Sequence, residues 1–146
     1  MRNRLTALLG ATLALACVAT AVAVAKTTAK PTKFAAAMNT RQEVPKEKGA
    51  PANAGGTFNA TLTGTTLKWT LSFSNLTGKA TAAHIHLAGI GKSGPVIVAL
   101  CSPCKTTSSG TAKITAKIAD EMLHGGAYVN VHTAKNPNGE IRGQVS

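Results

Sequence analysis

From Phe34 onward, apolar and polar residues alternate in short runs along the chain. In residues 57–63 every second side chain is apolar, and residues 67–73 repeat this pattern. A period of two places alternate side chains on opposite faces of a strand, so each run predicts a strand with one buried face. Residues 64–66 between them are few enough for a hairpin. These two runs therefore predict an antiparallel pair of strands.

Six further runs raise the number of expected strands to eight. They cover residues 34–38, 81–87, 96–100, 111–118, 127–133 and 140–145. Clusters of glycine, asparagine and proline separate them, and strands do not alternate with long helical patterns. The arrangement is typical of an all-β domain, an antiparallel β-sandwich or barrel of the immunoglobulin-like or Greek-key kind.

The run at residues 111–118 and the segment after it carry different signals. Alternate positions of the run predict a strand with four side chains facing the core: Ala112, Ile114, Ala116 and Ile118. In residues 120–126 two acidic residues open the segment and two glycines close it. Acidic side chains suit the start of a helix and glycine suits its left-handed end, so we expect one short helical turn there.

The first 25 residues predict a signal peptide. Arg2 and Arg4 supply a positive start, residues 5–24 form an uncharged apolar run, and small residues at 23–25 fit a cleavage site. We therefore expect cleavage near Ala25 and a secreted or periplasmic protein.

Cleavage would divide the chain into a signal peptide at 1–25, a flexible polar leader at 26–33 and one folded domain at 34–146. Two alternatives stay open for the first part. The apolar run is nearly long enough to remain as a membrane anchor, and Cys17 could be lipidated in a lipoprotein. With the segment removed, no transmembrane span is expected.

Basic residues greatly outnumber acidic ones. The 146 residues include 16 Lys and Arg against 5 Asp and Glu, a formal charge of +11, and removal of Arg2 and Arg4 leaves +9. Such a charge favours an anionic component of the cell envelope as partner, with another extracellular protein as the alternative. A specific nucleic-acid partner is not expected, because the lysines are scattered and aromatic side chains that could stack on bases are few.

Three histidines are the candidates for metal binding. His84 and His86 would share one face of the strand at 81–87, and His132 would lie on the corresponding face of the strand at 127–133. Imidazoles suit copper or zinc, with carbonyl or carboxylate partners such as Glu140 fixing their tautomers. The alternative is a structural role in which hydrogen bonds from these rings pin loops to the sheet. Folding itself should require no metal, because the domain is large enough to bury its own core.

Cys101 and Cys104 remain after cleavage, and their spacing permits a tight disulfide in an oxidising compartment. A redox site would use the same spacing but would place the first cysteine at a helix start, and here a polar loop follows. Catalysis is not expected either, because no nucleophile triad, phosphate loop or carboxylate pair is evident in the sequence.

Two longer motifs resemble a known family. They are Ala83-His84-Ile85-His86 followed by Gly94-Pro95-Val96-Ile97, and residues 128–133 running into 136–145; Gln42-Glu43-Val44-Pro45 resembles an opening motif. Together they resemble the CHRD domain family, named after chordin, over residues 34–145. The resemblance implies an all-β extracellular domain and no particular reaction. It singles out four further residues as motif positions: Glu43, Asn130, Glu140 and Arg142.

A looser analogy links His84-Ile85-His86 to the copper-binding strand of copper-zinc superoxide dismutase. A second cluster that would hold the zinc is not evident in the sequence, and a shared fold does not fix function. Three hypotheses remain. The first is an exported, non-enzymatic CHRD-type binding or structural protein, the second is a copper- or zinc-binding protein, and the third, most remote, is an enzyme resembling superoxide dismutase.

Overall fold

The computed structural model describes residues 30–146. The predicted signal peptide, the cleavage site and Cys17 lie outside this range and stay predictions. Among the described residues, no helix combines the length and apolar character that crossing a membrane requires.

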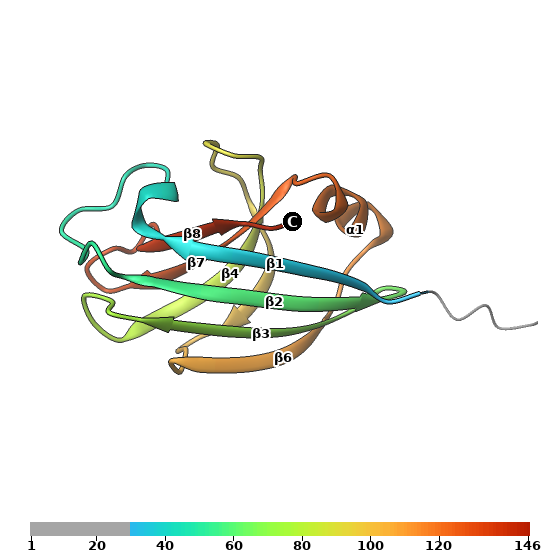
Figure 1. Ribbon diagram of the computed structural model, residues 1–146, viewed down its shortest axis with the longest axis horizontal. Helices are drawn as coiled ribbons and strands as arrows, with labels where there is room; N and C mark the ends of the chain where they lie inside the picture. The colour runs from blue at the N-terminus through green and yellow to red at the C-terminus, as the bar shows by residue number, and fades with distance from the viewer. Residues whose placement is uncertain (1–29) are drawn as a thin grey trace, which may run out of the picture.

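Eight strands form a single antiparallel sheet in the order β5-β4-β7-β8-β1-β2-β3-β6. The sheet curls until its edge strands, β5 and β6, contact each other, so it is nearly closed into a barrel (Figure 1). The prediction of an all-β antiparallel domain is confirmed. The strands are β1 (Thr32–Asn39), β2 (Gly55–Thr63), β3 (Thr66–Ser74), β4 (Ala80–Leu87), β5 (Val96–Cys101), β6 (Thr107–Lys113), β7 (Ala127–Thr133) and β8 (Ile141–Gln144), with a 3-10 helix η1 (Thr40–Gln42) and a helix α1 (Ala116–Leu123).

The hairpin of β2 and β3 follows the predicted alternation. Phe58 pairs with Leu71 and Leu62 with Leu67, and these side chains are buried, whereas their neighbours along each strand face outward. The turn needs a left-handed residue, and Gly64 supplies it with a φ of 58°. β1 extends this sheet and begins at Thr32 rather than Phe34, because Thr32 already pairs with Leu62.

The predicted strand at 111–118 is wrong in its position. β6 runs from Thr107 to Lys113, because its earlier residues already pair with β3. The hydroxyl of Thr115 then accepts a hydrogen bond from the Ile118 amide at 3.2 Å, which caps and starts α1. Ile118 and Met122, four residues apart, therefore share one helix face, and Met122 is fully buried. The predicted helical turn at 120–126 is the end of this longer helix.

β7 differs from the other long strands because both of its faces are buried. Its inner face packs into the core. Two loops, residues 43–50 and 88–95, lie beside its outer face, and we call them the roof: the Gly94 amide lies 3.5 Å from the Tyr128 hydroxyl, and the Lys48 amide donates to the Asn136 side chain after β7 at 3.3 Å. The Ser93 hydroxyl donates to the Val44 carbonyl at 3.1 Å and joins the two loops. The roof converts a polar sheet surface into a buried one.

The Sγ atoms of Cys101 and Cys104 lie 2.09 Å apart, which supports the predicted disulfide. The bond closes the turn that follows β5. The Cys104 amide also donates to the Ala80 carbonyl at 3.2 Å, so this turn is fastened to the start of β4. The pair therefore serves as a local staple at one end of the sheet.

Candidate metal centre

The strand pairing brings the three predicted histidines to one face of the sheet. On β4, His84 and His86 are the partners of Asn130 and Tyr128, and on β7 His132 is the partner of Ala82. The opposite face of these strands is made of fully buried apolar side chains: Ala83, Ile85, Val129 and Val131. The period of two therefore forces the histidines outward, where His132 is buried and His84 and His86 are half-buried.

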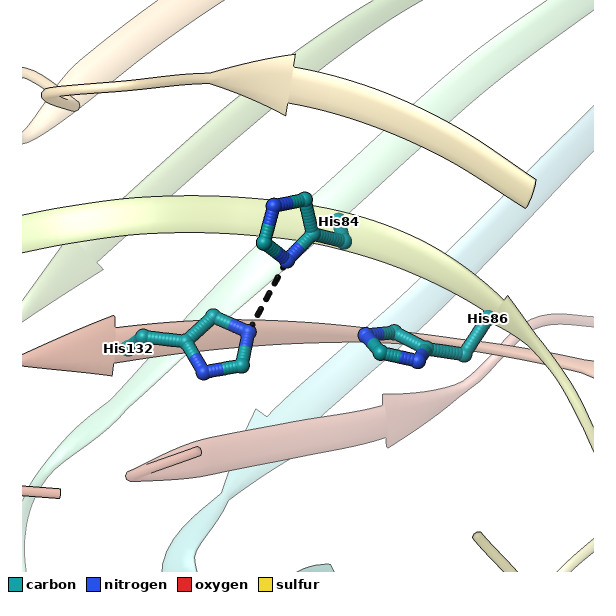
Figure 2. A group of neighbouring side chains, drawn as sticks. All are labelled: His84, His86 and His132. Atoms are coloured by element: carbon teal, nitrogen blue, oxygen red, sulfur yellow. Dashed lines mark hydrogen bonds between the residues drawn. The ribbon is translucent and has the colours of Figure 1, made fainter. Parts of the chain in front are cut away.

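The three rings face a common space (Figure 2). One ring nitrogen from each histidine can be chosen so that all three lie within 4.8 Å of one another. His84 Nδ1 and His132 Nε2 form a hydrogen bond of 3.0 Å. The structure thus brings together all three residues that the sequence singled out. That these three histidines bind a metal remains a prediction.

Two backbone carbonyls fix how the rings present their nitrogens. His132 Nδ1 lies 3.0 Å from the Pro137 carbonyl oxygen, and His86 Nδ1 lies 2.9 Å from that of Gly94. A carbonyl only accepts, so each Nδ1 carries the hydrogen and each Nε2 keeps its lone pair. Backbone carbonyls that hold the second ring nitrogen are typical of metal-ligating histidines.

The expected partner Glu140 has a different role. Its fully buried carboxylate accepts hydrogen bonds from the Thr77 amide at 2.6 Å and from the Asn136 side chain at 3.0 Å, and also from the hydroxyls of Thr77 and Thr133. Burial alone would raise the pKa of Glu140, but these hydrogen bonds together hold it below its ordinary value. Glu140 is therefore an ionised anchor for the loops around β7 and does not orient a histidine.

Electrostatics favour neutral imidazoles at this site. Burial, and then the neighbouring His86, lower the pKa of His84, and burial lowers the pKa of His132 to about 4. A neutral ring is the form that binds a metal ion. Near neutral pH, protons therefore compete little for the ring nitrogens of His84 and His132.

The spacing of the donors is close to what a metal needs. With metal–nitrogen bonds of about 2.0 to 2.1 Å, tetrahedral ligands lie about 3.4 Å apart. His84 Nδ1 and His132 Nε2, 3.0 Å apart, are already near that value. His84 Nδ1 donates the hydrogen of this bond, because His132 carries its own on Nδ1, so binding a metal through His84 Nδ1 requires that hydrogen to move to His84 Nε2. The other separations, up to 4.8 Å, require inward rotation of a ring. A change of the His84 tautomer and small changes of side-chain torsion would therefore complete a three-nitrogen site.

Aromatic stacking holds one of the three rings in place. The ring of Tyr128 lies parallel to that of His86, with an interplanar angle of 8° and centroids 4.8 Å apart. The guanidinium of Arg142 lies 3.5 Å from the centre of the Tyr128 ring on β7. Arg142 also donates to the roof carbonyls of Lys92 at 2.8 Å and Gly89 at 3.1 Å. Sequence analysis gave Tyr128 no such role, although the period of two places it beside His86.

Four buried acceptor atoms in the part of the chain that the structure describes lack a hydrogen-bond partner there. They are Asn39 Oδ1, Glu43 Oε1, His86 Nε2 and Asn130 Oδ1. A buried acceptor without a partner costs about 1 to 3 kcal/mol, so a group of them calls for an explanation by a ligand, ion or water.

Burial raises the pKa of Glu43 to about 7, against the opposing effect of the Arg142 charge. A Cβ at Gly139 would lie 2.5 Å from Glu43 Oε1, so this carboxyl needs glycine beside it.

The fold and these side chains define an antiparallel β-barrel domain with a covered, histidine-bearing polar face. A protein-family model described as the CHRD domain matches residues 34–145. The chain therefore belongs to the CHRD domain family, as its motifs predicted. A search of curated proteins and a search of solved structures each gave no match.

Proposed function

We propose that this CHRD-domain protein is an exported, non-enzymatic binding protein that holds a copper or zinc ion on His84, His86 and His132. The observation that carries the proposal is the common orientation of two Nε2 lone pairs, fixed by the Pro137 and Gly94 carbonyls, toward the third ring. A purely structural role would also use such carbonyls, but it would not leave His86 Nε2 buried without a partner.

Export is supported by the signal-peptide pattern and by the disulfide between Cys101 and Cys104, which suits an oxidising compartment. The strong positive charge supports an anionic envelope component as the partner of the exposed surface. In this proposal the metal ion is bound by the histidine face, and the hydrophobic core folds without it.

Titration calorimetry of the mature protein with copper(II) and with zinc(II) tests the proposal. We expect one ion per chain with a dissociation constant of about micromolar or tighter. Replacing both His84 and His132 by alanine should weaken binding more than about 100-fold, because two of three ligands are lost. A matched control is His124→Ala, since the side chain of His124, directly after α1, is 72% exposed.

Binding weaker than about 100 micromolar, or binding that survives the double substitution, would contradict the metal proposal. The non-enzymatic part has its own test. Copper-loaded protein should not accelerate superoxide decay beyond the same concentration of free copper. An acceleration that the double substitution removes would instead support the enzyme hypothesis.

A further inference from the structure

Asn130 lies at the centre of the histidine face. Its strand partner on one side is His84 of β4, and its partner on the other side is Arg142 of β8. Along β7, Tyr128 precedes it by two residues and His132 follows it by two, so all these side chains project from the same face. Asn130 is therefore next to His84, Arg142, Tyr128 and His132 on this face.

The rings of His86 and His132 lean toward this central position. His86 is the partner of Tyr128 and His132 is the partner of Ala82, so the row of His84 and Asn130 separates them. Four residues of strand span roughly 13 Å. The two ring centroids are nevertheless only 6.2 Å apart, and the His84 ring lies 5.7 Å and 4.9 Å from them (Figure 2). The three rings thus gather above the row that contains Asn130.

The amide oxygen of Asn130 is buried and has no hydrogen-bond partner within residues 30–146. The residue is 1% exposed, and Oδ1 is among the buried acceptors without a hydrogen bond. An amide oxygen accepts hydrogen bonds and does not gain a proton at neutral pH. It is therefore suited to receive a hydrogen bond from a donor held above it.

We infer that Asn130 Oδ1 accepts a hydrogen bond from a water molecule that fills the fourth position of the metal site. The inference rests on the proposed function. Three protein ligands leave a fourth position for water in sites of this type, and a metal ion makes its bound water a stronger donor. Asn130 is then a positioning residue that selects a hydrated, four-coordinate ion.

Cobalt(II) is a suitable probe because its absorption spectrum reports the coordination number and the ligands. Asn130→Leu should weaken cobalt(II) and zinc(II) binding about 10- to 100-fold, the usual effect of removing a partner of a metal-bound group. It should also shift the cobalt spectrum and the pH at which that spectrum changes. Asn130→Asp keeps an acceptor oxygen at the same place and should retain the affinity.

The matched control is Asn39→Leu. Asn39 also has a buried oxygen without a partner, but it lies on β1, on the far side of Arg142 from Asn130 and His84. This variant should bind cobalt(II) as the wild type does. Thermal melts without metal show which variants are folded.

Equal affinity and an identical cobalt spectrum in folded Asn130→Leu would overturn the inference, and so would an Asp variant as weak as the Leu variant. If the Leu variant does not fold, pulsed magnetic resonance of the copper-loaded wild type decides. Exchangeable protons of a bound water support the inference, and their absence refutes it. Failure of the wild type to bind any of these ions overturns the proposed function together with this inference, whereas wild-type binding unaffected by Asn130 overturns the inference alone.

Discussion

The β2–β3 hairpin and strand β7 belong to the same sheet but differ in how many of their faces are buried. On β2 and β3, side chains alternate between a buried inner face and an outer face open to solvent. On β7 every residue is buried, because the roof covers the outer face as well. The first region separates apolar from polar groups, while the second encloses polar and ionisable groups such as Asn130, Glu140 and Arg142.

The difference lies in the burial of polar groups, which costs free energy unless they form hydrogen bonds and which an apolar core avoids. An apolar inner face stabilises both regions in the same way, through removal of apolar surface from water. Polar groups of this region must also find partners, and Glu140 finds them in Thr77 and Asn136, so it ties the loops before β4 and after β7 together. Among those that do not, Asn130 Oδ1 and His86 Nε2 belong to the histidine face, and Asn39 Oδ1 lies beyond Arg142. The covered region is therefore the place to look for function.

The largest expected effect comes from the carboxylate that anchors the covered region. Glu140→Ala should lower the free energy of unfolding by about 3 to 5 kcal/mol, because several buried donors lose their acceptor at about 1 to 3 kcal/mol each. Thr57→Ala removes a hydrogen bond to Ser72 on the open face of β2 and β3, and should cost less than about 0.5 kcal/mol. Urea denaturation measures both. Similar values for the two variants would break the comparison.

A pH dependence should come from Glu43. Its pKa is raised from 4.5 to about 7 in the folded protein, so between these values the folded state holds a proton that the unfolded state has released. The free energy of unfolding should therefore fall by about 1.4 kcal/mol per pH unit as the pH rises through this window, about 3 kcal/mol in all. Above pH 7 this contribution should stay constant.

Glu43→Gln isolates this contribution. The difference in unfolding free energy between wild type and variant should change with pH across the window, because the variant lacks the group that titrates there. Urea denaturation from pH 4.5 to 8 measures this difference. A pH-independent difference for Glu43→Gln would show that this carboxyl ionises as freely as an exposed one.

The smallest expected effect concerns the attachment of the roof. Arg142→Lys keeps the charge but loses the paired hydrogen bonds to the Lys92 and Gly89 carbonyls and the stacking on Tyr128. We expect a loss of about 1 to 2 kcal/mol and faster hydrogen exchange of the amides in residues 88–95. Arg41→Lys, at an exposed position of η1, should leave both unchanged. Unchanged exchange in Arg142→Lys would mean that the roof is held by other contacts.

Much of the fold was predictable because a period of two is a local property. It identified β2, β3, β4 and β7 and placed His84, His86 and His132 on the outer face. The same period misplaced β6, since alternation alone does not show where a strand stops. The hydroxyl of Thr115 competes with the strand by capping α1, and that competition is decided by the pairing of β6 with β3 and the burial of Met122.

The candidate site was predictable only in part. The motif residues Glu43, Asn130, Glu140 and Arg142 were singled out by resemblance, without their roles. Glu140 was expected to orient a histidine, and the carbonyls of Pro137 and Gly94 take that place instead. A backbone carbonyl has no signature in the sequence, because every residue carries one. Which carbonyl meets a ring depends on the path of a loop.

By itself, the sequence determined the CHRD family, the antiparallel strands and the histidine-bearing face, because each follows from residue spacing or from a motif within a few positions. Only the tertiary structure decided that the β7 part of this face is buried and that His84 and His86 on β4 are half-buried. The roof joins residues 43–50 and 88–95 to β7 and β8, and its contacts span separations such as the 50 residues between Lys92 and Arg142. Such burial depends on contacts between segments far apart in the sequence, so it cannot be predicted from the spacing of neighbouring residues.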